Sequence, residues 1–539
     1  MSKLTQQVER RRTFAIISHP DAGKTTLTEK LLLYGGAIHL AGSVKARRAQ
    51  RHATSDWMEL EQQRGISVTS SVMQFPYKGL EINLLDTPGH KDFSEDTYRT
   101  LAAADCAVML IDVAKGVEPQ TRKLFEVCAL RGIPIFTFIN KMDRFGHPPL
   151  DLMAEIEEVL GIRTCPINWP VGMGREFRGV YDRRAGVMAL HDADATHGES
   201  AIEHHEVKPD SPELAQLLGK AVHEQLMEEI ELLEIAGDPY DLDRVRAGKL
   251  SPVFFGSALT NFGVELFLDA FIEMAPSPIA RTSNVGVVEP DDERFSGFIF
   301  KVQANMNPNH RDRIAFMRIC SGTLETGMNV FHDRLGREVQ IKDARQFLAQ
   351  ERVAVDEAVA GDIVGLYDTG LFRIGDTLAV GQPADFHYDE LRRFSPEIFA
   401  RVRLNKVLKR KALEKGLRHL ADEGAVQLFE SWNDNDVEPI LGAVGQLQFE
   451  VLKYRLEAEY KVDVTFDALP FTCARWVDGA SFDPRKFQGR EATTCVKDKD
   501  GRALLLLRNE WALNWIKQDY KDLKFFTYAP DGRNVEADV

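Results

Sequence analysis

Cysteine is scarce in this 539-residue chain, which has six, and no two of them form a CxxC pair. Zinc sites and disulfide frameworks usually need closer spacing, so we expect reduced thiols of the kind found in a cytosol. No apolar run is long enough to cross a bilayer, because Asp105 and Asp112 interrupt the most apolar stretch, residues 101–114. The amino terminus lacks the apolar segment of a secretory signal. These absences predict a cytoplasmic chain that has no membrane partner.

Positive charge is also in deficit. The chain has 67 Lys and Arg against 82 Asp and Glu, which gives a formal net charge of −15. Bulk electrostatic attraction to nucleic acid is therefore excluded, and we expect no DNA partner. The 44% apolar and 28% charged residues are typical of a folded protein. At about 150 residues per domain, the length predicts three to four domains.

Apolar runs ending in polar residues dominate the first half of the chain. They occupy residues 14–17, 80–85, 106–111, 133–139 and 253–255. Four are continuously apolar, which is typical of parallel strands buried on both faces, whereas the run at 80–85 partly alternates and could lie nearer an edge. In an open parallel sheet, ligands bind outside the carboxyl ends of the strands. The polar residues that follow these runs are therefore candidates for a ligand site.

The chain divides into three predicted domains. Residues 1–280 are expected to form an α/β domain with a mostly parallel sheet and a helical insertion at about 150–250. Residues 275–293 are rich in Pro, Asp and Glu and read as a linker. Short strand-like runs separated by glycines predict an antiparallel β-barrel over 281–386, and residues 387–539 mix strands with helices at 411–423 and 441–454, as in an α+β domain.

Two surface segments each leave two interpretations open. The insertion contains an acidic helical stretch at 212–236, which is either a solvated helix face or a partner surface. The segment at 401–411 has six basic residues and no acidic one, and is either a contact surface for RNA or protein or a solvated edge strand.

A phosphate-binding loop is expected directly after the first strand. The sequence SHPDAGKT fits the GxxxxGK[ST] pattern, with Ser18 in place of the first glycine. Backbone amides of such a loop surround phosphates at a helix N-terminus. Lys24 would bring its charge to the β- and γ-phosphates, and the hydroxyl of Thr25 could bind Mg²⁺.

Three further motifs follow later strands in the order of a guanine-nucleotide site. DTPG begins at Asp86, whose carboxylate could hold Mg²⁺ through water, while the amide of Gly89 could sense a γ-phosphate. In NKMD, an ionised Asp143 could accept both N1–H and N2–H of guanine, a pair that adenine lacks. GSA, which includes Ala258, could add a backbone donor to guanine O6. Each motif alone could be a turn or a polar cap, but four in order are unlikely by chance.

These motifs resemble those of the GTPase superfamily and, with the sequence RGIS before DTPGH, those of translational GTPases. The resemblance implies that His90 orients the attacking water and that Ser67, which stands where the family has Thr, reaches Mg²⁺. The metal ligands implied are thus Thr25, Ser67 and Asp86, and the catalytic residues are His90 and Lys24. The expected nucleotide contacts are Ser18, His19, Pro20, Asp21, Ala22, Gly23, Lys24, Thr25, Thr26, Asp86, Thr87, Pro88, Gly89, His90, Asn140, Lys141, Met142, Asp143, Ser257 and Ala258.

Longer phrases narrow the resemblance. LLLYGGAIHLAGSVKAR, SDWMELEQQRGISVTSSVMQF, DFSEDTYRTL, FSPEIFARVR and AVGQLQFEVLKYRL closely resemble the bacterial class-II peptide chain release factors. From the length we expect no room for the two further domains of ribosomal translocases, and the sequence has no Gly-Gly-Gln motif, with which class-I factors release the peptide. The resemblance implies a monomeric, ribosome-stimulated GTP hydrolase with GTP or GDP and Mg²⁺. It would promote dissociation of class-I release factors without hydrolysing peptidyl-tRNA.

Three rival functions remain open at this point. A truncated translocase-like factor would show translocation activity. A metabolic P-loop kinase would need an acceptor pocket and would not need NKMD. A guanine-nucleotide sensor without useful turnover would keep its cellular activity when His90 is replaced by alanine.

Overall fold

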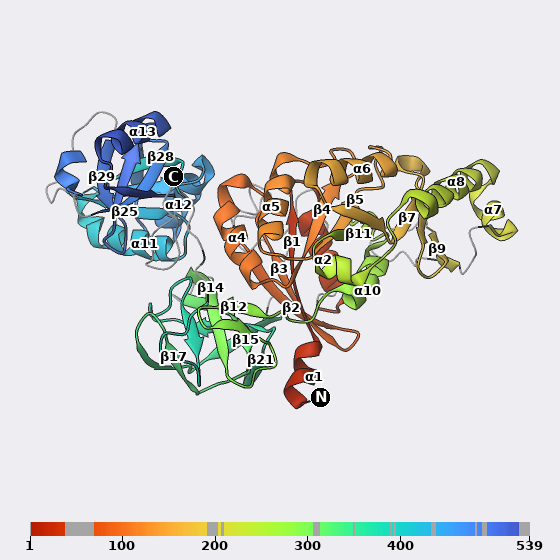
Figure 1. Ribbon diagram of the computed structural model, residues 1–539, viewed down its shortest axis with the longest axis horizontal. Coiled ribbons are helices and arrows are strands. Elements are labelled where there is room, and N and C mark those ends of the chain that lie inside the picture. Colours follow the sequence, from red (N-terminus) through yellow and green to blue (C-terminus); the bar gives the residue numbers. More distant parts are fainter. Residues whose placement is uncertain are drawn as a thin grey trace.

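The computed structural model describes residues 2–37, 69–190, 203–205, 210–304, 313–348, 351–388, 391, 395–432, 438–479, 482–487 and 493–527. Figure 1 shows three bodies of secondary structure, of which the first carries an extension that projects away from the other two. All six cysteines lie in the described part of the chain, and none forms a disulfide bond. Within the described ranges, no helix has the length and apolar character needed to cross a membrane.

The first body is built on a sheet with the order β2-β3-β1-β4-β5-β11-β6, in which only β2 runs antiparallel to its neighbour. This confirms the mostly parallel sheet, with the run at 80–85 next to the antiparallel strand. The strands are β1 (Arg11–Ser18), β2 (Ser71–Tyr77), β3 (Leu80–Asp86), β4 (Cys106–Asp112), β5 (Ile135–Asn140), β6 (Arg163–Pro166) and β11 (Leu250–Phe255).

Strand β1 explains why these runs are continuously apolar. Phe14 and Ile16 pack into one hydrophobic cluster, whereas Ala15 and Ile17 pack into another. Because successive side chains of a strand point to opposite faces, each face of the sheet must be covered. The helices of this body are α1 (Lys3–Glu9), α2 (Lys24–Tyr34), α4 (Ser94–Ala103), α5 (Pro119–Leu130), α6 (Pro149–Leu160) and α10 (Val264–Met274), with a 3₁₀ turn η1 (Lys91–Phe93).

The insertion is not only helical, contrary to expectation. A four-stranded antiparallel sheet precedes its helices, and α6 and β6 belong to the main body. Strands this short give too little periodicity to be read from sequence. The elements are β7 (Asn168–Val171), η2 (Gly174–Glu176), β8 (Gly179–Asp182), β9 (Val187–Leu190), β10 (Glu203–His205), α7 (Pro212–Leu218), α8 (Lys220–Ala236) and α9 (Leu242–Arg246). The acidic stretch is divided into α7 and α8 by Gly219, which has φ 81° and ψ 152°.

The second body is antiparallel, as expected, and its strands follow the order β18-β17-β23-β14-β15-β22-β19. The expected linker contains a small hairpin, β12 (Arg281–Ser283) with β13 (Gly286–Val288). A single parallel pairing of Leu348 with Gln74 joins β19 to β2, so the sheets of the first two bodies are continuous. The remaining strands are β14 (Ser296–Ala304), β15 (Arg313–Ser321), β16 (Thr323–Glu325), β17 (Asn329–His332), β18 (Arg337–Gln340), β19 (Ala344–Leu348), β20 (Glu351–Ala354), β21 (Glu357–Val359), β22 (Ile363–Tyr367) and β23 (Thr377–Ala379).

The third body mixes strands and helices, with a separate sheet ordered β27-β24-β26-β25-β29-β30-β28-β31. The helix expected at 441–454 starts later, at Gln446, because residues 440–443 pair as a strand with β24 and β25. The elements are β24 (Ile398–Leu404), η3 (Val407–Lys409), α11 (Arg410–Asp422), β25 (Gln427–Ser431), β26 (Ile440–Ala443), α12 (Gln446–Tyr460), β27 (Val464–Leu469), β28 (Cys473–Asp478), η4 (Pro484–Phe487), β29 (Thr493–Lys497), β30 (Ala503–Leu507), α13 (Glu510–Asp519) and β31 (Lys524–Phe526).

Candidate guanine-nucleotide site

The phosphate loop lies between the end of β1 at Ser18 and the start of α2 at Lys24. Gly23 caps the helix with φ 101°, a left-handed conformation that side chains rarely adopt. A Cβ atom at this position would also lie 2.3 Å from Nδ2 of Asn140. The loop therefore needs glycine here both for its turn and for its contact with the NKMD loop.

Lys24 and Asp86 form a buried ion pair at the end of the phosphate loop. Nζ of Lys24 lies 2.6 Å from Oδ1 of Asp86, and both side chains are buried. The hydroxyl of Thr28 donates to the same carboxylate oxygen at 3.3 Å. Thr25, one residue into α2, is only partly buried. A buried, charge-assisted pair of this kind fixes both groups at the edge of the sheet.

The DTPGH loop packs directly against the phosphate loop. The hydroxyl of Thr87 donates to the carbonyl oxygen of Ile16 at 2.7 Å, which ties the loop to β1. A Cβ atom on Gly89 would lie 3.3 Å from the backbone nitrogen of Pro20. Residue 89 can therefore be little larger than glycine if its amide is to stay beside the phosphate loop. His90 follows, with about a third of its side chain exposed (34%).

Asn140 connects three of the four motifs. Its Nδ2 donates to the carbonyl oxygen of Ala22 at 2.8 Å, and its Oδ1 accepts from the amide of Ala258 at 2.9 Å. Lys141 has φ 70° and binds Asp112, with Nζ 2.6 Å from Oδ2. Its Nζ also donates to the carbonyl oxygen of Asp21. The NKMD loop is thereby fastened to the phosphate loop.

Asp143 lies beside the GSA loop, where the hydroxyl of Ser257 donates to its Oδ1 at 2.6 Å. All three backbone amides of that loop donate within the protein, Gly256 to Ile139, Ser257 to Phe262 and Ala258 to Asn140. The carboxylate expected to bind guanine is therefore held in place by a side chain in the loop after β11. Donation of a backbone hydrogen bond to guanine O6 stays a prediction.

The structure thus brings all four motifs together at the carboxyl ends of β1, β3, β5 and β11. Ser67, which the resemblance places at Mg²⁺, lies outside the described residues. Sequence reasoning missed several supporting side chains, each of which contacts a predicted residue: Thr28, Asp92, Asp112 and Glu118. Asp112 could have been found, because it ends a buried strand as the motif residues do. Glu118, which lies 3.2 Å from His19, carries no such signal.

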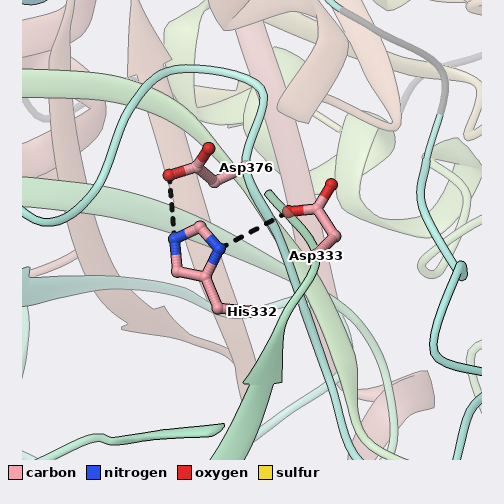
Figure 2. A group of neighbouring side chains, drawn as sticks. All are labelled: His332, Asp333 and Asp376. Carbon is pink, nitrogen blue, oxygen red and sulfur yellow. Dashed lines mark ion pairs between the residues drawn. The ribbon is translucent and has the colours of Figure 1, made fainter. Parts of the chain in front are cut away.

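A second cluster in the described ranges, away from this site, has the composition of a metal centre: His332, Asp333 and Asp376 (Figure 2). Its geometry favours an ion-pair network instead. The two ring nitrogens face different carboxylates, Nδ1 towards Asp333 at 3.6 Å and Nε2 towards Asp376 at 3.0 Å. Asp376 is also held by the guanidinium of Arg334 at 2.7 and 2.9 Å. Burial alone would lower the pKa of His332, but the two carboxylates outweigh it and raise the pKa.

Comparison with known proteins first identifies the class. Residues 9–277 match the Elongation factor Tu GTP binding domain, and residues 294–381 match Elongation factor G domain 2. The chain is therefore a GTP hydrolase assembled from translation-factor domains. A crystal structure from Thermus thermophilus has the same fold, with a TM-score of 0.69 and 22% identity, over 92% of this chain and 71% of its own.

The carboxyl-terminal region identifies the particular family. Residues 388–517 match the Class II release factor RF3, C-terminal domain. Peptide chain release factor 3 from Symbiobacterium thermophilum is 59% identical, over 97% of this chain and 99% of that protein. The protein of the same name from Trichormus variabilis is 55% identical, over 98% and 97%. This chain belongs to the peptide chain release factor 3 family, which confirms the resemblance, and is a GTPase of translation termination.

Proposed function

We propose that this chain works on the ribosome after peptide release, where its GTP state promotes departure of a class-I release factor. Hydrolysis of GTP then lets the chain itself leave. The observation that carries the proposal is the convergence of four guanine-nucleotide motifs on one site, in a chain that matches release factor 3 over nearly its whole length. A nucleotide can shift a conformational equilibrium only through contacts that differ between two states.

Guanine would be selected by Asp143. Its carboxylate, held by Ser257, presents acceptors to N1–H and N2–H of the base. Asp143→Asn replaces an acceptor with a donor, so GTP binding should weaken by at least about tenfold, the effect of one lost charge-assisted pair. Xanthine has a carbonyl at C2 in place of the amine and should regain the pairing. Titration with GTP and with xanthosine triphosphate checks this expectation, and equal losses for both would contradict it.

Mg²⁺ is proposed to bind between the phosphate loop and Asp86. The donors available are a partly buried hydroxyl on Thr25 and the buried carboxylate of Asp86, and hard oxygen donors of this kind suit Mg²⁺. Ser67 is the third proposed ligand. The ion would neutralise charge on the β- and γ-phosphate oxygens. The buried carboxylate also lies beside Lys24, so the local charge would be balanced by both cations.

The proposed reaction is transfer of the γ-phosphoryl group to water. A bond forms between the water oxygen and the γ-phosphorus, and the bond from that phosphorus to the bridging oxygen of GDP breaks. Lys24 and the loop amides would stabilise the charge that develops on the phosphate oxygens. His90 would hold the attacking water, and the ribosome would complete its placement, so hydrolysis by the isolated protein should be slow.

The decisive experiment uses post-termination ribosomes that carry a fluorescent class-I factor. We expect GTP and a non-hydrolysable analogue to accelerate departure of the label, with the analogue trapping the present protein on the ribosome. Lack of acceleration by any nucleotide would overturn the proposal. His90→Ala should keep nucleotide binding but lose at least about a hundredfold of ribosome-stimulated hydrolysis. Unchanged turnover would show that His90 does not take part in hydrolysis, whereas cellular activity that survives the loss of turnover would favour the sensor.

The remaining assignments are proposals of the same kind. We propose a monomer in the cytoplasm, with a nucleotide-binding domain at 1–280, a barrel domain at 281–386 and a third domain at 387–539. Support comes from the separate sheets of the first and third bodies and from the ranges of the three family matches.

A further inference from the structure

The turn that carries His90 is bound by the third domain. The carboxylate of Asp92, in η1, accepts a hydrogen bond from the backbone amide of Leu447 at 2.8 Å. Leu447 lies in the first turn of α12, where amides have no partner within the helix and the helix dipole favours a negative charge. Asp92 is 4% exposed, so this contact is sealed from solvent. A side chain of the nucleotide-binding domain thus accepts a hydrogen bond from a backbone amide at the start of a helix in another domain.

Asp92 also holds His90. Nδ1 of His90 lies 3.3 Å from the amide of Asp92, which donates to it, and 3.4 Å from Oδ1 of the same residue. The two carboxylate oxygens therefore face in different directions, one towards the imidazole and the other towards α12. The ring borders a groove of about 660 Å³ whose other wall includes Glu397, Val444 and Gly445 of the third domain. His90 therefore faces the third domain in this arrangement.

Gly445 allows the approach. A Cβ atom at this position would lie 2.0 Å from Cγ and 2.1 Å from Oδ1 of Asp92, so only glycine lets α12 reach the carboxylate. Its φ of −151° and ψ of 166° are open to any residue, so the requirement comes from the neighbouring domain and not from the local backbone. A small apolar contact supports the same junction, in which Phe93 packs on Val451 of α12.

We propose that the third domain restrains His90 through Asp92, and that the ribosome releases this restraint when it moves the third domain. In the docked state, α12 fixes Asp92, and Asp92 keeps the imidazole in the groove between the domains. Separation of α12 from Asp92 would free His90 to turn towards the γ-phosphate. Asp92 is accordingly a positioning residue. The inference rests on the proposed role of His90 in GTP hydrolysis.

Gly445→Ala tests the proposal, because it blocks the contact without straining its own backbone. GTP hydrolysis by the ribosome-free variant should rise at least about fivefold, the lower end of typical coupling between sites, while GTP affinity and the ribosome-stimulated rate stay unchanged. The amide of Leu447 should lose protection in hydrogen exchange. Gln446→Ala is the matched control, since Gln446 is exposed in the same helical turn and makes no described contact with Asp92.

Val451→Asp breaks the junction by a different route and keeps the test valid if Gly445→Ala fails to fold. Val451 packs on Phe93 outside the main hydrophobic cluster of its own domain, so the third domain should stay folded. Both variants should raise ribosome-free hydrolysis, and adding His90→Ala should abolish the gain. An unchanged or reduced rate in a folded variant, or a gain that survives His90→Ala, would overturn the restraint. If the wild-type protein shows no ribosome stimulation at all, the proposed function fails instead.

Discussion

The nucleotide-binding domain meets the barrel and the third domain through two different kinds of contact. Towards the barrel it uses buried charge, since Asp105 lies 2.6 Å from Arg318 and both side chains are at most 1% exposed. Gln74 extends the contact by donating to the carbonyl oxygen of Ile363 at 3.0 Å. Towards the third domain it uses single hydrogen bonds. Arg99 donates to the carbonyl oxygen of Gly424 at 3.3 Å, and the carboxylate of Asp92 accepts from the amide of Leu447 at 2.8 Å.

The barrel and the third domain are in turn joined by ion pairs nearer the surface. Arg373 lies 3.1 Å from Asp500, with side chains 41% and 27% exposed, and Arg313 lies 3.4 Å from Asp422, with side chains 10% and 19% exposed. Exposed pairs contribute about 0–1 kcal/mol each, whereas separating a buried pair leaves charges without a partner at about 3–5 kcal/mol. We therefore expect the first two domains to move as one body, and the third domain to separate from them at a lower cost in free energy.

Asp96 takes part in the contact between the first two domains near the proposed nucleotide site. Burial alone would raise the pKa of its carboxyl, but Lys301 of the barrel, Arg99 and hydrogen bonds from Ser70 together lower the pKa. Nζ of Lys301 also donates to the carbonyl oxygen of Ser70. Ser70 lies three residues after Ser67, the third proposed metal ligand. The barrel is therefore attached to the chain close to that residue.

The largest effect on stability is expected at the buried ion pair between Asp105 and Arg318. Asp105→Asn should lower the free energy of unfolding by about 3–5 kcal/mol, because Arg318 keeps its charge in a buried site without a carboxylate. Asp500→Asn, at the ion pair with Arg373, should change it by less than about 1 kcal/mol. Chemical denaturation of both variants checks the contrast. Similar losses would mean that the two interfaces do not differ in strength.

A smaller effect is expected at the basic segment of the third domain. Arg401, Arg403 and Arg410 form ion pairs with Glu438, Asp467 and Glu414, so half of the predicted positive charge is already neutralised. The lysines of the segment are exposed and form no described ion pair: Lys406, Lys409 and Lys411. We therefore predict that these three lysines, and not the paired arginines, contact the ribosome.

Changing Lys406, Lys409 and Lys411 together to Glu should weaken ribosome binding by about ten- to a hundredfold and reduce its dependence on salt. Replacement of the three paired arginines by Gln should cost less, because their charge is already compensated. Binding measured by sedimentation at several salt concentrations checks both. Unchanged binding of the lysine variant would favour the alternative of a solvated edge.

The grouping of the four motifs could be predicted from sequence, because it depends only on where each strand ends. Each motif stands at the end of an apolar strand, and parallel strands bring such ends together, so Lys24, Asp86 and Asp143 could be grouped without a structure. The three bodies could be predicted because the periodicity of apolar residues changes along the chain. The same change distinguished the parallel sheet from the antiparallel one.

Contacts between domains could not be predicted from the sequence. Asp92 and Leu447 are 355 residues apart, and neither position carries a periodicity or a motif that reports the other. The glycine at 445 looks like an ordinary helix start, because its requirement arises from Asp92 and not from its own backbone. Register is similarly hidden, since residues 440–443 form a strand only because β24 and β25 lie on either side.

The smallest expected effect lies within the barrel, at the network of His332, Asp333, Asp376 and Arg334. Because the pKa of His332 is raised in the folded state, its protonated form stabilises the fold below the unfolded pKa of about 6.5, and this contribution is lost as pH rises through the folded pKa. Wild-type stability should therefore fall relative to His332→Gln as pH rises from about 6.5 through the folded pKa.

The pKa of Asp376 is shifted in the opposite direction. Burial alone would raise it, but His332 and Arg334 lower it, so its contribution is present at neutral pH and is lost only as pH falls through the folded pKa in acid. The alkaline loss therefore isolates His332. Thermal unfolding of wild type and His332→Gln across this pH range checks the sign. A difference that stays constant with pH would show that the ring is neutral, and Asp376 would then be paired with the charge of Arg334 and not with a charge on His332.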